Sequence, residues 1–133
     1  MAAVRTTAQA AGDDAESAVA ASLLGTGWTI LARNMRVGRG ELDIVAIDPG
    51  PPAELVIVEV RWRRSRAFGL AEETVDHRKA AHLRAAVGRL LEDGQAGGIV
   101  LPRLPIRVDL VVAEPGVGDG RAVRTRHHRA IPL

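Results

Sequence analysis

Several residue types that build common functional sites are absent or rare in this chain of 133 residues. It has no cysteine, which excludes disulfides, thiolate nucleophiles and zinc sites built on cysteine. Its only aromatic side chains are Trp28, Trp62 and Phe68, which disfavours a single-strand binder built on base-stacking platforms. No segment approaches the roughly 20 apolar residues of a membrane span, and residues 1–12 lack the strongly apolar run that is typical of a signal peptide. We therefore expect a cytoplasmic protein with no membrane partner.

Positive charge is carried almost entirely by arginine, since Lys79 is the only lysine. The formal net charge of +2 hides an uneven distribution. Residues 1–60 hold four arginines against eight acids, residues 61–89 hold eight basic residues against three acids, and residues 121–129 add four arginines and two histidines. An acidic half beside a basic half is what a metal-dependent site acting on a polyanion needs. The alternative is a GC-rich genome, which raises arginine and alanine content everywhere.

Hydrophobic periodicity predicts one α/β domain in the order α-β-β-β-α-β, with a further strand at the end. Residues 1–12 are expected to form a flexible N-terminal arm, and residues 13–133 the domain. The expected elements are a helix from Asp13 to Gly25, strands at 28–37, 41–47 and 54–62, a helix at 72–92, irregular chain at 94–105, a strand at 106–112 and a short strand near 123–127. The first three strands should meander antiparallel, and the second helix should place the next strand parallel to a neighbour.

Two acidic residues interrupt apolar strands that we expect to be adjacent. Asp43 is flanked by Leu42 and Ile44, and Glu59 follows an unbroken apolar run. A carboxylate in a buried strand is costly unless it is paired, hydrogen-bonded or bound to a cation. If the strands pair across the Pro/Gly turn at 48–52, the acids converge at one end of the sheet, where they suit Mg²⁺ or Mn²⁺. The alternative is that both acids simply pair with arginines.

A cluster of cations follows the second acid. These residues are Arg61, Arg63, Arg64 and Arg66, with Lys79 on the following helix. Arginine forks match phosphate oxygens in bidentate fashion, so we expect the cluster to bind a nucleic-acid backbone. A solvated strand end is the alternative. Lys79 lies on the apolar side of its helix, and either reaches the sheet end or only extends its ammonium to water.

Other charged residues remain open between structural and functional roles. Glu16 stands three residues after Asp13, as in a capping box, or is a third acid that reaches a metal. Asp109 alternates within its strand and is expected to have a structural role, paired with an arginine. His127 and His128 have neither the spacing of metal ligands nor an evident partner. No P-loop, dinucleotide fingerprint or serine nucleophile elbow is present.

The ordered motifs GELDIVA, LVIVEVRWRRS, FG, VDHRK and RVDLVV resemble the YraN family, an uncharacterised bacterial family, from about residue 12 to the C-terminus. That family is similar in fold to PD-(D/E)XK nucleases and archaeal Holliday-junction resolvases. The resemblance implies a restriction-endonuclease-like fold, a mixed β-sheet of four or five strands flanked by helices. It implies that Asp43 and Glu59 match the metal-binding acids of the nuclease motif, and that Glu16 matches the helix acid of the resolvases. It also implies action on structured or branched DNA and, by analogy, a homodimer.

Arg61 stands at the position of the motif's lysine, which in nucleases of this fold positions or activates the attacking water. An arginine stays protonated at physiological pH and cannot act as a general base, although it can stabilise charge on a transferring phosphate. Three functions remain open. One is a Mg²⁺- or Mn²⁺-dependent endonuclease with Asp43, Glu59, Arg61 and Glu16 as catalytic residues. Another is an inactive nucleic-acid-binding module of the same fold. A protein-interaction domain with structural ion pairs is the third alternative.

Overall fold

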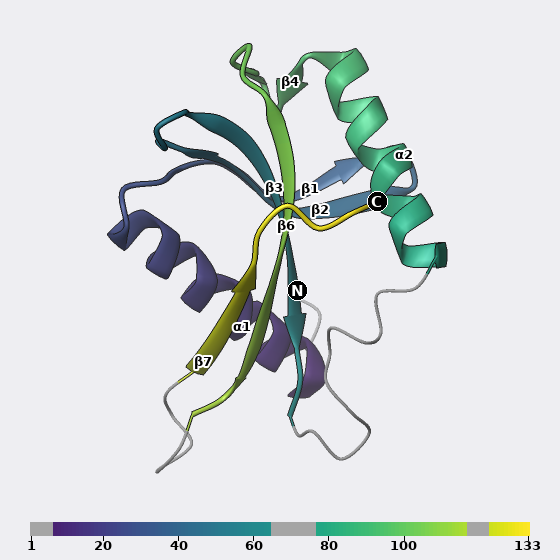
Figure 1. Ribbon diagram of the computed structural model, residues 1–133. Helices are drawn as coiled ribbons and strands as arrows, with labels where there is room; N and C mark the ends of the chain where they lie inside the picture. Colours follow the sequence, from purple (N-terminus) through teal and green to yellow (C-terminus); the bar gives the residue numbers. More distant parts are fainter. Residues whose placement is uncertain (1–6, 65–76, 117–122) are drawn as a thin grey trace.

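The computed structural model describes residues 7–64, 77–116 and 123–133, and the structural statements below concern those ranges. Its elements are α1 (Thr7–Gly25), β1 (Thr29–Val37), β2 (Gly40–Asp48), β3 (Glu54–Trp62), α2 (His77–Asp93), β4 (Gln95–Ala96), β5 (Ile99–Val100), β6 (Ile106–Pro115) and β7 (Val123–His128). Five strands form one sheet in the order β1-β2-β3-β6-β7, with α1 on one face and α2 on the other (Figure 1). This arrangement confirms the predicted α/β, restriction-endonuclease-like fold.

The sheet is mixed because one connection crosses over. β1, β2 and β3 pair antiparallel, β3 pairs parallel with β6, and β7 pairs antiparallel with β6. Parallel neighbours need a long crossover connection, and α2 lies in the chain between β3 and β6. β3 has its predicted bounds, whereas β6 continues past the predicted end at Val112 because Ala113 and Glu114 still pair with β7.

Each face of the sheet has its own hydrophobic core, since strand side chains alternate between faces. The core under α2 includes Leu42, Leu55, Ile57, Leu83 and Leu90. The core under α1 includes Val19, Leu23, Ile44, Val56 and Val58. β2 and β3 are therefore buried on both faces, which explains why their sequences read as nearly continuous apolar runs. A charged side chain in these strands must find its partners within the protein or at a strand end.

α1 begins at Thr7, well before the predicted start at Asp13. Asp13 and Glu16 therefore lie inside the helix, and the predicted capping box is wrong. The alanine-rich stretch before Asp13 favours helix strongly, so residues 7–12 of the predicted arm extend α1. Residues 1–6 lie outside the described ranges.

The stretch at 94–105 was predicted to be irregular but contains a small hairpin of β4 and β5. Gly97 and Gly98 form its turn, and both have the positive φ that a two-residue hairpin turn requires. Strands of two residues are too short to show an alternating pattern. The predicted helix at 72–92 is confirmed from His77 onwards, and its first residues lie outside the described ranges. Within those ranges, no helix is long and apolar enough to span a membrane.

Candidate functional site

The two strand acids come together where the pairing between β2 and β3 ends. The last paired residues are Ile44 and Val58, and Asp43 and Glu59 are the next residues on their strands. The backbone N–H of Val60 donates a hydrogen bond of 2.8 Å to Asp43 Oδ2. The Asp43 carboxylate thus takes the place that a strand carbonyl would otherwise occupy. The strand alternation and the Pro/Gly turn predicted this convergence.

Asp43 is also unpaired on the other side of β2, where β1 is the neighbouring strand. Its pairing with β2 passes from Arg33–Ile44 to Met35–Leu42 without joining Asn34 to Asp43. Asn34 has a φ of 50°, a left-handed conformation that asparagine tolerates better than most residues. A cavity of about 280 Å³ opens here, and its acidic lining residues are Asp13, Glu16, Glu41 and Asp43. The interruption therefore gives the Asp43 carboxylate access to an acidic hollow.

The ionisation of Asp43 is disfavoured by its surroundings. Burial, followed by repulsion from Glu59, raises the pKa of Asp43 to about 7. The N–H of Val60 opposes this shift, while the more distant charge of Glu16 adds to it. Two neighbouring carboxylates that resist joint ionisation are stabilised by a cation between them. The pair therefore has the chemistry of a site for a hard divalent ion.

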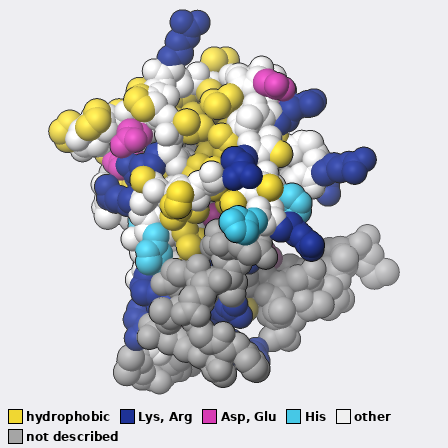
Figure 2. All heavy atoms as spheres, turned by 45° about the vertical axis from the view of Figure 1, so that its right-hand side comes forward, with side chains coloured by type: hydrophobic (Ala, Val, Ile, Leu, Met, Phe, Trp, Pro, Cys, Tyr) yellow, Lys and Arg dark blue, Asp and Glu magenta, His cyan; other side chains and the backbone are white. Residues whose placement is uncertain are grey.

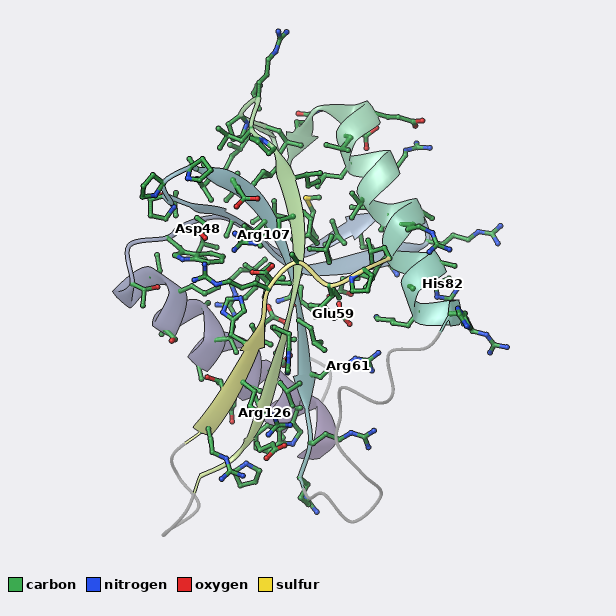
Figure 3. The ribbon with its side chains drawn as sticks, viewed as in Figure 1. Asp48, Glu59, Arg61, His82, Arg107 and Arg126 are labelled. Atoms are coloured by element: carbon green, nitrogen blue, oxygen red, sulfur yellow. The ribbon has the colours of Figure 1, made fainter. Side chains whose placement is uncertain are left out.

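Glu59 is buried and directs one oxygen, Oε1, towards two cations. Lys79 Nζ, from α2, lies 2.8 Å from that oxygen, and Arg61 Nε lies 3.8 Å from it. Figure 3 shows Glu59 and Arg61 on β3, both extending towards the side of α2. Lys79 therefore reaches the sheet end, which was one of the two predicted alternatives, because its helix crosses the sheet above β2.

Arg61 has a donor that nothing in the described part of the chain satisfies. Its Nε is buried and makes no hydrogen bond, since 3.8 Å to Glu59 is beyond hydrogen-bond range. A buried donor without an acceptor costs about 1–3 kcal/mol. The Arg61 side chain is 31% exposed, so a ligand can approach the guanidinium group. An oxygen supplied by an anionic ligand would relieve this cost.

Glu16 faces the same cavity as Asp43 but is not part of a compact ligand set. It is buried on α1, and its Oε1 lies 3.4 Å from Arg33 Nε. Burial raises the pKa of Glu16 despite the favourable charge of Arg33. In the described ranges, no three His, Cys, Asp or Glu side chains lie close enough together to hold a metal ion. The structure thus joins Asp43 to Glu59 and leaves Glu16 at the rim.

The other predicted phosphate-binding arginines follow β3. The N–H of Arg63 donates to Ala113 O at 3.0 Å, which continues the pairing with β6 one residue past the strand. Arg63 is half-buried and Arg64 is exposed, while Arg66 lies outside the described ranges. The described arginines of this cluster therefore lie at the end of β3 nearest the acidic pair.

A second charged cluster, which sequence reasoning did not find, lies at the opposite end of the sheet. Arg107 on β6 donates to Asp48 at 3.0 Å and to Glu54 at 2.9 Å, and binds both oxygens of Asp109 at 2.9 and 3.0 Å. Its guanidinium carbon also lies 5.6 Å from the ring centre of Trp28. Asp48 and Arg107 are labelled together in Figure 3. We call the residues Asp48, Glu54, Arg107, Asp109 and His127 the arginine network.

Asp109 is the buried centre of the arginine network. It also accepts a hydrogen bond from the N–H of Ala130 at 2.9 Å and lies 2.7 Å from His127 Nε2. Burial alone would raise the pKa of Asp109, but the bonds from His127 and Arg107 outweigh it and lower the pKa to about 2. The expected pairing of Asp109 with an arginine is confirmed, and the view that His127 lacks a partner is wrong. The spacing of Arg107 and Asp109, two apart on one strand face, was the available signal.

Comparison with known proteins identifies the family. Residues 15–113 match the family described as "Uncharacterised protein family UPF0102". A UPF0102 protein of Symbiobacterium thermophilum is 37% identical over 115 residues, which cover 83% of this chain and 86% of that protein. A UPF0102 protein of Pseudomonas syringae pv. tomato is 36% identical over 121 residues, covering 90% and 89% of the two chains. The resemblance predicted from the motifs is confirmed, and the chain belongs to the UPF0102 (YraN) family.

Proposed function

We propose that the protein is a metal-dependent, endonuclease-like protein that acts on DNA, with Asp43 and Glu59 as its ion ligands. The observation that supports this most directly is the meeting of these two acids at a partly buried strand end, where burial and then repulsion from Glu59 raise the pKa of Asp43 to about 7. Mg²⁺ is commonly held by one or two carboxylates, with water and substrate phosphate completing its shell. Such an ion, or Mn²⁺, would polarise a phosphodiester and lower the pKa of an attacking water.

The cations around the acidic pair would bind the phosphate. Arg61 has a buried Nε without an acceptor, which a phosphate oxygen would satisfy. Because arginine stays protonated, Arg61 would stabilise charge and would not remove a proton. Lys79 would leave Glu59 when an ion enters and contact the phosphate instead. Glu16 would orient water in the cavity that it shares with Asp43.

The flanking backbone contacts would come from the chain that follows β3. Arg63 and Arg64 lie directly after this strand, and Arg66 is two residues further along the sequence. Phosphate contacts of this kind fix the register of a nucleic acid without reading its sequence. We therefore expect these arginines to contribute salt-sensitive affinity and little sequence preference.

A second candidate, a nucleic-acid-binding module without catalysis, is favoured by the position of Lys79. Its ammonium lies 2.8 Å from Glu59, where it already neutralises the acid that an ion would use. This candidate predicts salt-sensitive DNA binding with no cleavage in any metal. Replacing Arg61 by lysine separates the candidates further, since cleavage gained by Arg61→Lys would show a site that lacks only its base.

The decisive experiment is a calorimetric Mn²⁺ titration of the wild type beside Asp43→Ala. Asp93→Ala is the matched control, because Asp93 is exposed at the end of α2 and its ion pair with Arg89 is exposed as well. We expect binding in the wild type and the control, and a loss of at least tenfold in affinity in Asp43→Ala. A wild type that binds no divalent ion would remove the chemistry of the nuclease proposal.

Cleavage is then measured on branched and linear DNA with Mg²⁺ and Mn²⁺. Activity that requires both Asp43 and Glu59 supports the endonuclease. Ion binding without cleavage of any substrate supports the binding module. Cleavage that persists in both Asp43→Ala and Glu59→Ala would mean that the acids have been assigned wrongly.

A further inference from the structure

The last strand of the sheet carries a row of basic side chains that the proposed site does not use. In β7, Arg124, Arg126 and His128 alternate with Thr125 and His127. Thr125 and His127 line a small cavity against α1. Because side chains alternate along a strand, Arg124, Arg126 and His128 lie on the other face of the sheet, on the side of α2.

Arg126 lies in register with Arg61 across the sheet. β6 provides the link, since Val112 pairs with Arg61 on one side and with Arg126 on the other. Arg61 shares the α2 face with Ile57, which packs in the core under α2. Figure 3 shows Arg61 and Arg126 at the same end of the sheet. The two arginines therefore belong to one surface, which includes the candidate site.

Helix α2 does not cover this part of the face, where Ile131 of the C-terminal segment packs on Leu110 and Val112 instead. It packs on β2 and β1, on the far side of β3 from β7. Figure 2, turned towards the side of α2, shows Lys, Arg and His side chains around a hydrophobic surface above the grey atoms, with fewer Asp and Glu side chains between them. The charged side chains visible in that view are mainly basic.

A buried acid holds the two arginines of β7 in position. Glu114 Oε2 lies 3.0 Å from Arg124 Nη2, and Glu114 Oε1 lies 2.6 Å from Arg126 Nη1. The Glu114 side chain is 5% exposed, whereas those of Arg124 and Arg126 are 48% and 26% exposed. Among the described residues, two partly exposed cations therefore share one buried acid. Glu59 with its two cations repeats this pattern on the same face.

We propose that Arg124 and Arg126 form a second phosphate-binding row and that this face binds double-stranded DNA. The inference rests on the proposed function and specifies its substrate. Arg61 and Arg126 are two strand spacings apart, or about 10 Å. That separation lies between the widths of the minor and major grooves of B-DNA, about 6 and 12 Å. Two backbones facing each other across a groove can therefore contact both rows, whereas a single strand follows one.

The spacing along β7 also matches a nucleic-acid backbone. Residues two apart on an antiparallel strand are about 6.8 Å apart, and each DNA strand advances about 3.4 Å per nucleotide. The distance between Arg124 and Arg126 therefore corresponds to about two nucleotides along one DNA strand. The row on β7 would hold one backbone while Arg61 and the arginines after β3 hold the other.

The test compares binding of a short DNA duplex and of one of its single strands, in EDTA so that no strand is cut. Fluorescence anisotropy over a salt series is measured for the wild type, Arg124→Gln and Arg126→Gln. Arg129→Gln is the matched control, because Arg129 carries the same charge but lines the cavity beside the arginine network on the α1 face. Thermal unfolding of each variant shows that it is folded.

We expect each β7 variant to weaken duplex binding about three- to tenfold and to lower the salt slope by about 0.9, the value for one phosphate contact. Single-strand binding should change little, and Arg129→Gln should match the wild type. Glu114→Gln removes the acid and keeps both arginines, so it should tighten duplex binding. If the two arginines had only a structural role, Glu114→Gln would not tighten duplex binding.

Two results would overturn the inference in distinguishable ways. If the wild type binds DNA and Arg61→Gln weakens it while the β7 variants do not, the second row is wrong and the proposed function survives. If the wild type binds neither duplex nor single strand, the proposed function and the second row fail together.

Discussion

Two aspartates at opposite ends of the same sheet, the buried Asp109 and the half-buried Asp43, have pKa values that move in opposite directions. Asp109 lies in the arginine network, and its pKa falls to about 2. Asp43 lies beside Glu59, and its pKa rises to about 7. Burial raises the pKa of both groups, so the difference comes from their partners. Asp109 is bonded to Arg107, His127 and a backbone N–H, whereas Asp43 has one backbone N–H and a second acid.

The arginines at the two ends repeat this difference. Arg107 is almost fully buried and contacts three carboxylates, so its donors are satisfied within the protein. Arg61 is more exposed and retains a buried donor without an acceptor. Completed charge networks stabilise a fold, while incomplete ones of mixed sign are candidates for ligand sites. The contrast favours a structural role for the arginine network and is the basis of the binding role that we propose for the other end.

The largest expected effect is a loss of stability when the arginine network is broken. Arg107→Met removes the partner shared by Asp48, Glu54 and Asp109 and leaves buried acids uncompensated. We expect a loss of about 3–5 kcal/mol in the free energy of unfolding, measured with urea at neutral pH. Arg89→Met, which disrupts an exposed pair with Asp93, should cost less than about 1 kcal/mol. Equal, small losses in both variants would contradict the structural assignment.

The next-largest effect is a gain in the free energy of unfolding instead of a loss, and it depends on pH. Because the pKa of Asp43 is raised in the folded protein, folding retains a proton there, and the stability of the wild type is lost as pH rises through about 7. Asp43→Asn should therefore stabilise the metal-free protein at pH values above 7, by on the order of 4 kcal/mol. Below the ordinary pKa of aspartate, near 4, the variant and the wild type should converge. A stability difference between Asp43→Asn and the wild type that does not change with pH would show that the pKa of Asp43 is not raised in the folded protein.

A smaller effect tests the competition between Lys79 and an ion. Lys79→Met removes the ammonium 2.8 Å from Glu59 and should lower the stability of the metal-free protein by about 1 kcal/mol. It should also strengthen Mn²⁺ binding about tenfold, because Glu59 is no longer neutralised, which corresponds to about 1.4 kcal/mol. Calorimetry on both proteins measures the change. Weaker Mn²⁺ binding in Lys79→Met would instead make Lys79 a support for the ion site.

The smallest effect concerns the rim of the site. Arg33→Gln removes the partner of Glu16, but the Arg33 side chain is 38% exposed and the contact is long, at 3.4 Å. We expect less than about 1 kcal/mol of lost stability in thermal or urea unfolding. A loss as large as that of Arg107→Met would place Glu16 among the structural acids and remove it from the site.

The sequence predicted the parts of this protein that depend on local patterns. The apolar runs located β2 and β3, and strand alternation placed Glu59 and Arg61 on one face. It did not predict the arginine network. Asp48 and Glu54 pair across β2 and β3, but Arg107 reaches them only through the parallel register of β3 and β6. The capping pattern at Asp13 predicts a later start of α1 than the structure shows, because the alanines before Asp13 have a high helix propensity and extend the helix to Thr7.

The hydrogen bond from Val60 to Asp43 connects the candidate site to a signal that can be observed without a substrate. The N–H of Val60 donates to the carboxylate itself, at 2.8 Å, so its electronic environment follows the charge on that group. Protonation of Asp43 weakens this bond, because a charged acceptor forms the stronger hydrogen bond. A cation bound to the carboxylate would also change the bond, because it polarises the acceptor oxygen. The amide resonance of Val60 is thus a spectroscopic reporter placed in the backbone beside the site. Its chemical shift can follow pH and metal titrations with no label beyond isotopic nitrogen.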